Sequence, residues 1–274
     1  MSDTALAALK AGRLGDCLKL GQDAARREPA KVEHRILLFQ VCALTGDWRR
    51  ALRQLEIVAD LDPKRELFCA LYRPLPALEA IRAEVFGGKR APMCLGQPPA
   101  WFAHLPEALR LDAQGEHAAA KRLRDEAFAD AEAVPGKLEG AAFAWLADAD
   151  ERLGPVLEAM VDGRYLWIPF ERIKQVELEA PKDLRDFIWL RARITLANEG
   201  TAAGFLPVRY PGSEASEDAG LRLARQSEWR QLGDGSWVGL GQRMLATDLG
   251  EHALLDCRLI ELDARPFEGA LEHE

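Results

Sequence analysis

The chain has no Cys-x-x-Cys pair and only five cysteines, an odd set, in 274 residues. Three of them, Cys17, Cys42 and Cys69, occur in apolar helical patterns. In such a pattern a cysteine behaves as a small hydrophobic residue, whereas a disulfide framework needs paired cysteines. This usage argues against a disulfide-rich secreted domain and indicates a reducing cytoplasm.

Long hydrophobic runs are also missing. A transmembrane helix needs roughly 18 or more consecutive apolar residues, and no segment of the sequence approaches that length. The stretch MSDTALAALKAGRLGDC lacks the basic region followed by an apolar region that marks a signal peptide. We therefore expect a soluble protein that is neither inserted into a membrane nor exported.

Basic residues are not in excess. Residues 1–140 carry 21 Lys and Arg against 20 Asp and Glu, and residues 141–274 carry 15 against 24, which together give the net charge of −8. Nucleic-acid-binding domains need a basic surface that displaces counterions. The charge therefore argues against a nucleic-acid partner.

Motifs for metal, nucleotide or covalent chemistry are scarce. The histidines have no Cys or His at zinc-ligand spacing. Ser213 and Ser216 are not part of a G-x-S-x-G elbow. Gly239 and Gly241 lack the third glycine and the following helix of a dinucleotide site. The sequence predicts no catalytic residue, no cofactor and no metal ion.

Two carboxylates stand close together in WLADADERLGP. As a calcium loop starting at Asp148, this segment has Leu153 where a glycine is needed and Ala159 where a bidentate glutamate should stand. As an acid–base pair, Asp148 and Asp150 would point to different faces of a helix or a strand. We interpret the segment as the junction of two domains, where an aspartate caps a turn or pairs with Arg152.

Two segments of the first half align without a gap at a period of 34 residues: GRLGDCLKLGQDAARREP from Gly12 and GDWRRALRQLEIVADLDP from Gly46. In each, a glycine ends one helix and a small residue five positions later lets the next helix pack closely. This pattern is typical of tetratricopeptide repeats, in which each helix pair buries its apolar stripe against the next pair. A third copy is predicted from Gly115.

Shorter helices are expected up to Tyr72, over 77–86 and over 101–111, because prolines and a glycine-rich loop interrupt the period. Residues 141–149 would complete a tetratricopeptide-like helical domain over 1–150. The repeat register predicts that one face of the second repeat points to the concave side of the solenoid, where peptides or helices bind. That face carries Glu33, Ile36 and Gln40.

After Gly154 the apolar period changes to about two residues. PVLEAMVDGRYLWIPF predicts two strands joined at Asp162-Gly163, a hairpin signal. Segments rich in β-branched and aromatic residues follow: RIKQVELEAP, DFIWLRARITLA, AGFLPVRY, GSWVGLGQRMLAT and HALLDCRLIEL. With one helix around 217–225, they predict a mostly antiparallel, barrel- or sandwich-like β-rich domain over 151–274. The fold class is therefore α+β with two domains.

Six segments of the second half, in this order, carry a family resemblance: FAWLADADERLGPVLE, GRYLWIPF, PKDLRDFIW, VRYPGSE, SEW and GLGQRML. Behind a tetratricopeptide-like region, they resemble the ImpE/SciE family, also called TagJ, accessory proteins of bacterial type VI secretion. The resemblance covers nearly the whole chain, and its specificity lies in the second half.

The resemblance implies a cytoplasmic, non-enzymatic protein that associates with the contractile sheath. Members are expected to bind the N-terminal helix of the small sheath subunit, TssB, and so to act near the step at which the ATPase ClpV recycles contracted sheath. Two surfaces of this chain are candidates for that helix. They are the concave face with Glu33, Ile36 and Gln40, and the acidic β domain around Arg185, Asp186, Tyr210 and Trp229.

Two alternatives to a binding module stay open. One is an enzyme with a polar site in the C-terminal domain, for which Asp148, Asp150, Arg185 and Asp186 are candidates. Convergence of these side chains in an open pocket would favour it, whereas mutual pairing in a packed interface would not. The other alternative is a structural scaffold that dimerises.

Overall fold

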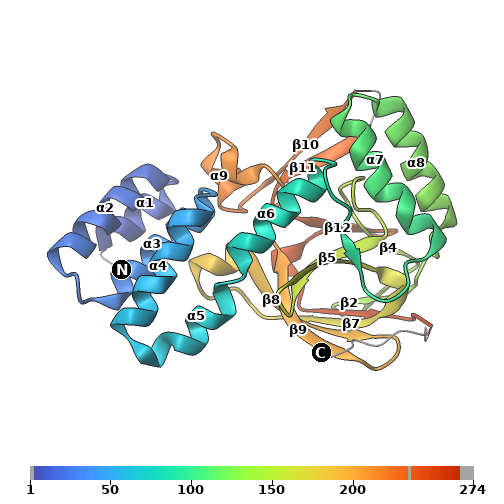
Figure 1. Cartoon of the computed structure of the whole chain (residues 1–274). Helices are drawn as coiled ribbons and strands as arrows, with labels where there is room; N and C mark the ends of the chain where they lie inside the picture. The colour runs from blue at the N-terminus through green and yellow to red at the C-terminus, as the bar shows by residue number, and fades with distance from the viewer. Residues whose placement is uncertain (1–2, 234–235, 266–274) are drawn as a thin grey trace.

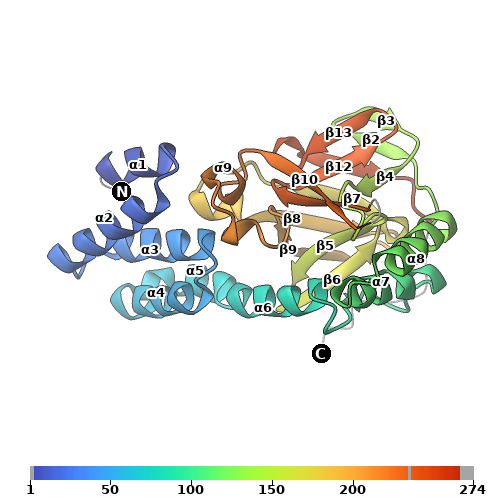
Figure 2. The ribbon, with the colours of Figure 1, turned by 90° about the horizontal axis from the view of Figure 1, so that it is seen from above.

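The computed structural model describes residues 3–233 and 236–265, which form an α+β fold (Figure 1). Eight α-helices precede the main β region within these residues: α1 (Asp3–Lys10), α2 (Leu14–Arg27), α3 (Val32–Leu44), α4 (Trp48–Leu61), α5 (Glu66–Tyr72), α6 (Leu75–Phe86), α7 (His104–Ala113) and α8 (His117–Asp130). Figure 2 shows α6 running along one side of the β region towards α7 and α8. None of the helices in the described ranges combines the length and apolarity needed to cross a bilayer.

The glycines at the repeat boundaries have left-handed backbone conformations. Gly12 and Gly46 have φ of +73° and +70°, and Gly115, before the third predicted copy, has φ of +81°. A residue without Cβ adopts such angles at little cost. Five positions after the first two glycines, Cys17 and Ala51 are fully buried. The glycine-plus-five relation thus has the structural cause that the sequence predicted, while a tetratricopeptide superhelix stays a prediction.

Strands occupy most of the remaining chain: β1 (Met93–Cys94), β2 (Gly136–Leu138), β3 (Ala141–Phe143), β4 (Leu146–Asp148), β5 (Val156–Val161), β6 (Arg164–Pro169), β7 (Ile173–Leu178), β8 (Trp189–Leu196), β9 (Thr201–Pro207), β10 (Ser227–Leu232), β11 (Ser236–Gly241), β12 (Met244–Thr247), β13 (Gly250–Ala253) and β14 (Leu259–Leu262). The nine-stranded main sheet has the order β1-β6-β5-β9-β8-β7-β14-β2-β3. Two small sheets, β10-β11 and β13-β12-β4, accompany it. Apart from the parallel pair β1-β6, the strand pairs are antiparallel, as expected.

The hairpin predicted at Asp162-Gly163 is confirmed. Strands β5 and β6 pair from Val156↔Pro169 to Val161↔Arg164. Asp162 and Gly163 have φ of +49° and +68°, which a type I′ turn requires at both central positions. The short helix α9 (Ala219–Arg222) likewise lies in the predicted interval.

The prediction of a helical end over residues 141–149 is wrong. Strands β3 and β4 occupy this interval; β3 pairs with β2, and β4 pairs with β12. Alanine has the highest helix propensity, but tertiary context overrides propensity here, and the burial of Leu146 and Asp148 on either side of Ala147 follows the strand period instead. Strands that precede residue 150 thus join sheets formed by later strands, while the division into domains at that residue stays a prediction.

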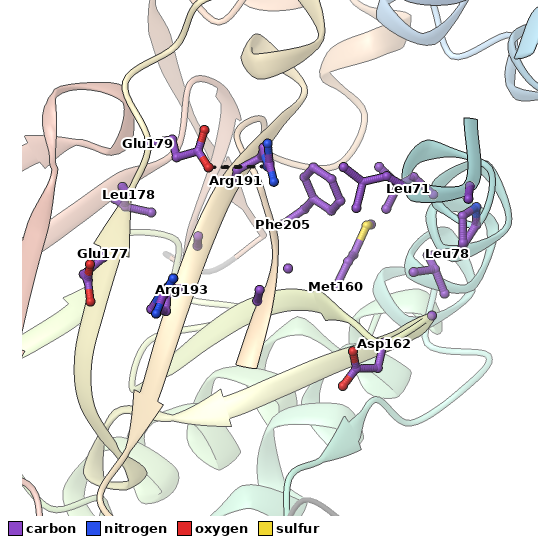
Figure 3. A pocket seen from close by; sticks show the side chains of 17 residues that line it. Leu71, Leu78, Met160, Asp162, Glu177, Leu178, Glu179, Arg191, Arg193 and Phe205 are labelled. Atoms are coloured by element: carbon purple, nitrogen blue, oxygen red, sulfur yellow. Dashed lines mark ion pairs between the residues drawn. The ribbon is translucent and has the colours of Figure 1, made fainter. Parts of the chain in front are cut away.

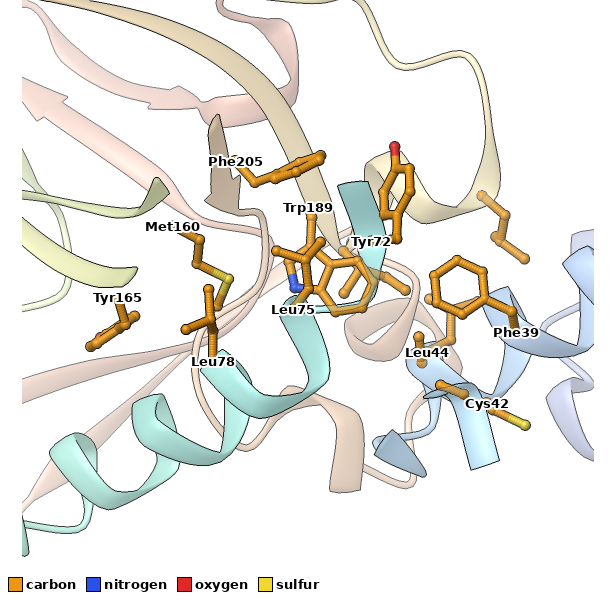
Figure 4. Packing of buried hydrophobic residues seen from close by; sticks show 14 of the residues in the cluster. Phe39, Cys42, Leu44, Tyr72, Leu75, Leu78, Met160, Tyr165, Trp189 and Phe205 are labelled. Atoms are coloured by element: carbon orange, nitrogen blue, oxygen red, sulfur yellow. The ribbon is translucent and has the colours of Figure 1, made fainter. Parts of the chain in front are cut away.

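One apolar cluster joins the helices to the strands (Figure 4). The Phe39 ring of α3 stacks against Trp189 of β8 at a centroid distance of 6.3 Å. Tyr72 of α5 lies 5.9 Å from Phe39 and 5.2 Å from Phe205 of β9. Aromatic pairs in such geometries add about 0.5–1.5 kcal/mol beyond the burial of their area. The junction is therefore a packed core rather than a linker.

Candidate functional site

A closed network of charged side chains lies at the junction between α6 and the main sheet. At its centre is Glu158 of β5, which is fully buried. Its Oε1 accepts hydrogen bonds from Arg82 Nε of α6 at 2.6 Å and from the Tyr165 hydroxyl at 2.5 Å. Its Oε2 accepts from Arg82 Nη2 at 3.1 Å and from Arg243. One carboxylate thus holds two guanidinium groups that come from opposite halves of the chain.

The network continues from Arg243 to Asp148. Arg243 donates to the Asp148 carboxylate and, through Nε, to the Pro207 carbonyl at 2.8 Å. The Tyr210 hydroxyl lies 3.1 Å from Asp148 Oδ1 and accepts a hydrogen bond from the Met244 amide. Asp148 is therefore part of a packed interface rather than of an open site.

Helix α6 supplies the other end of the network. Glu79, one turn before Arg82, accepts a 2.7 Å hydrogen bond from Trp189 Nε1 and lies 3.4 Å from Arg82 Nη1. Arg82 also donates to the Arg209 carbonyl, and Arg209 donates to the Leu44 carbonyl at the end of α3. Buried charges are tolerated when they are paired and hydrogen-bonded in this way.

Burial and neighbouring charges shift the pKa values of Asp148, Glu79 and Glu158 to different extents. Burial raises the pKa of Asp148 to about 6, although Arg243 opposes the shift, and burial also raises the pKa of Glu79. For Glu158 burial acts in the same direction, but Arg82 and Arg243 outweigh it and hold the pKa of this carboxyl below its ordinary value. Glu158 is therefore the fixed negative charge of the network.

Asp150 closes the turn that follows β4. Its carboxylate accepts from the Arg152 side chain, with Nη2 at 2.5 Å, and from the Gly239 amide at 2.9 Å. The backbone of Gly154, at φ +53°, lies so close to the Phe128 ring of α8 that a Cβ would overlap it. The Arg152 pairing predicted for this segment is confirmed, and the turn packs between α8 and β5.

The two surfaces predicted as alternatives for a partner contact each other inside the chain. Gln40 of α3 is buried, and its Nε2 donates to Asp183 Oδ1 at 2.8 Å. Asp183 also pairs with Arg185, whose Nε donates to the Tyr72 hydroxyl at 2.8 Å. Asp186 caps the short 3-10 helix η4 (Leu184–Phe187) by accepting from the Asp183 amide. The expectation that Gln40 lies on an open concave face is wrong, because η4 covers it.

The other predicted partner-binding residues are dispersed. Glu33 is exposed on the first turn of α3, and Ile36 is half-buried against the apolar cluster. Tyr210 is fully buried, and the half-buried Trp229 ring lies 5.7 Å from the Tyr210 ring. Binding of a partner by these residues stays a prediction.

An open groove of about 480 Å³ lies between α5–α6 and the outer face of the sheet (Figure 3). Leu71 and Leu78 line one side, and Met160 of β5 and Phe205 of β9 form an apolar floor. Charged side chains of β7 and β8 form the opposite rim, where Arg191 lies 3.5 Å from Glu179. We call this the α5–α6 groove. No sequence motif pointed to it, because its walls come from segments far apart in the chain.

Potential metal ligands are dispersed in the described residues, and two of the thiols have raised pKa values. Within residues 3–233 and 236–265, no three His, Cys, Asp or Glu side chains are grouped so that they could bind a metal ion. Burial raises the pKa of Cys42 to about 11 and that of Cys257 to about 12, so these thiols stay protonated at neutral pH.

Comparisons with known proteins agree with this architecture. The family model described as "ImpE protein" matches residues 140–261, which span β3 to β14. A Pseudomonas aeruginosa protein, described as "Type VI secretion system accessory component TagJ", is 47% identical over 260 residues, covering 95% of this chain and 90% of that protein. The chain belongs to the ImpE/TagJ family. A crystal structure of a Vibrio parahaemolyticus protein has the same fold, with a TM-score of 0.86, 21% identity, and coverage of 94% of this chain and 97% of that one.

The segments that resemble ImpE/TagJ proteins supply most of the polar side chains of the closed network. Asp148 and Glu158 belong to FAWLADADERLGPVLE, Tyr165 to GRYLWIPF, and Arg243 to GLGQRML. Sequence reasoning missed Glu158 and Arg243 as members of one cluster. The available signal was a single carboxylate inside the apolar strand PVLEAMV, since an unpaired charge is almost never fully buried.

Proposed function

We propose that this protein is a non-enzymatic accessory component of a type VI secretion system that binds the N-terminal helix of the small sheath subunit. It would work in the cytoplasm, near the step at which the ClpV ATPase recycles contracted sheath. Membership of the ImpE/TagJ family and the type VI secretion role named for the Pseudomonas aeruginosa relative support the secretion role. The observation that carries the binding role is the α5–α6 groove, which Leu71 of α5 lines with a partly exposed apolar side chain, one helical turn after the exposed Leu67.

A non-enzymatic role is supported by the state of the polar side chains that were candidates for chemistry. Asp148 is bound by Arg243, Asp150 by Arg152, and Asp186 by backbone amides. Arg185 is held by Asp183 and Tyr72 in a different part of the molecule from Asp148. A general acid or base must reach the substrate, and these groups are committed to internal partners.

Titration calorimetry tests the proposal. The full chain is titrated with a synthetic peptide that carries the N-terminal helix of the small sheath subunit from the same organism. We expect saturable binding with a negative heat-capacity change, because apolar surface becomes buried. A rise in melting temperature with peptide concentration should accompany it. Absence of both, with a peptide shown to be soluble and able to form a helix, would remove the proposed partner.

A further inference from the structure

We propose that the α5–α6 groove is the docking site for a single amphipathic helix of net positive charge. The inference rests on the proposed function, because it assigns the partner helix to a surface that the family description does not specify. It replaces the two surfaces suggested by the sequence, one of which is partly covered by η4 through the Gln40–Asp183 contact.

An exposed apolar track leads into the groove. On α5, Leu67 is 83% exposed and Leu71 is 38% exposed, and the two lie one helical turn apart on the same face. Leu75 and Leu78 of α6 also line the groove but are buried, so its exposed apolar contact lies on α5. Contiguous apolar side chains at a surface commonly mark interaction sites.

The sheet beneath the groove favours a helical ligand over an extended one. The groove lies on the face of β8 and β9, and both strands already have neighbours on each side, in the order β5-β9-β8-β7. An extended peptide gains its affinity by adding backbone hydrogen bonds at a sheet edge. No edge is offered on this face, whereas a helix satisfies its own backbone groups and needs only apolar anchors at i, i+3 or i+4, and i+7.

The charges of the rim favour a basic partner. Arg191 pairs with Glu179 at 3.5 Å, and Arg193 stands directly opposite Glu177 in the β7–β8 register. Asp162 at the β5–β6 turn is exposed. Among the described residues that line the groove, it is the charged residue that faces no residue of opposite charge. Residues 141–274 as a whole carry 24 acidic against 15 basic residues. Such a surface attracts a positively charged helix and speeds its association.

Leu67 and Leu71 of α5 would hold the apolar anchors of the helix, beside a buried floor formed by Met160 and Phe205. Met160 and Phe205 are directly paired across β5 and β9, so their side chains project from the same face of the sheet. Binding energy is expected to come mainly from the exposed leucines of α5, and the charged rim is expected to set orientation and association rate.

Fluorescence anisotropy with the labelled sheath-subunit peptide tests the assignment. In the Leu71→Glu variant a charge enters the apolar track, and we expect affinity to fall by roughly tenfold or more. Leu67→Glu is the second variant, because that side chain is the more exposed and is the less able to affect folding. The matched control is Leu249→Glu, since Leu249 is 60% exposed at the β12–β13 turn, outside the groove. Affinity of the control should stay within about twofold of wild type.

The Asp162→Asn variant tests the charge component separately. Asparagine accepts the left-handed conformation of this turn position, so the hairpin is retained. We expect weaker binding at low salt and no difference from wild type at about 0.5 M salt, where screening removes the attraction. Equal affinity of Asp162→Asn and wild type at low salt would overturn the requirement for a basic partner.

The outcomes separate the two proposals. If wild type binds the peptide and both leucine variants bind it equally well, the groove assignment is overturned and the proposed function stands. If wild type does not bind, the proposed function and the groove assignment both fall. If Leu249→Glu loses as much affinity as Leu71→Glu, the effect is not specific to the groove and the assignment is again overturned.

Discussion

The junction network and the groove rim use the same residue types in opposite surroundings. Arg82 and Glu158 form an ion pair whose side chains are at most 5% exposed, whereas Arg191 and Glu179 are each about half exposed. In the interior a charge that loses its partner has no water to replace it. At the surface water screens both charges, and such a pair contributes about 0–1 kcal/mol. The first pair therefore fixes the architecture, and the second is free to respond to a partner.

The largest effect is expected when the centre of the network loses its charge. Glu158→Gln leaves Arg82 and Arg243 buried beside a neutral amide, so the free energy of unfolding at neutral pH should fall by about 3–5 kcal/mol. Glu179→Gln, the matched change at the rim, should alter it by less than about 1 kcal/mol. Urea unfolding of both variants measures the difference, and similar losses would remove the distinction between the two regions.

The pH dependence of this effect follows from the lowered pKa of Glu158. A carboxyl group whose folded pKa is below its unfolded pKa contributes stability above the unfolded value of 4.5, and this contribution is lost as pH falls through the folded pKa. The difference in the free energy of unfolding between wild type and Glu158→Gln should therefore become smaller below pH 4.5. A gap that stays constant in acid would contradict the assigned direction.

A smaller effect should follow from filling the close contact at the junction. Gly154→Ala places a Cβ on a left-handed backbone and against the Phe128 ring. We expect the free energy of unfolding to fall by about 2–3 kcal/mol. Gly140→Ala is the control, because Gly140 has φ of +84° but open space around its Cβ position. Its loss should be about 1 kcal/mol. Thermal unfolding of the two variants separates the cost of overlap from that of the backbone conformation.

Asp148 should respond to pH in the opposite sense to Glu158. Burial raises its pKa from 3.8 to about 6, so the protonated form is favoured in the folded state. The stability that the protonated Asp148 carboxyl contributes is fully present below pH 3.8 and is lost as pH rises through about 6. Asp148→Asn is always neutral and should gain stability relative to wild type across this window. Chemical unfolding at several pH values measures the gain, and no change would show that Arg243 outweighs burial.

The smallest expected effect concerns the contact between α3 and η4. Gln40→Ala removes the hydrogen bond to Asp183 and should cost about 1–2 kcal/mol, whereas Glu33→Ala on the exposed turn of the same helix should be nearly neutral. Denaturant unfolding of both variants tests this. A sheath-helix affinity that depends on Glu33 but not on Leu71 would restore the concave face as the docking surface.

Sequence patterns predicted the features whose causes are local. The turn at Asp162-Gly163 and the helix boundary at Gly46 depend on backbone conformations that few residue types accept. The helix predicted over the residues of β4 is wrong, because the pairing of this strand with β12 depends on residues about 100 positions later.

The contacts that define the candidate site are likewise long-range. Gln40 and Asp183 are 143 residues apart, and no spacing rule connects them. The α5–α6 groove exists only because α5 and α6 pack beside β9, so its lining could not be deduced from any single segment. The turns are specified by neighbouring residues in the sequence. The junction network and the groove rim, in contrast, are formed only by the tertiary structure.

The spread of the network along the chain has a consequence for biosynthesis. Arg82 leaves the ribosome 76 residues before Glu158, and Glu158 precedes Arg243 by a further 85. At about 5–20 residues per second, the first interval alone lasts roughly 4–15 s. During that time Arg82 has Glu79 of the same helix as a partner but not yet Glu158, and the apolar face of the nascent helices awaits β8. Productive folding of this chain is thus expected to be a late event, with a period in which a chaperone or the ribosome surface must keep the helical half from associating with other chains.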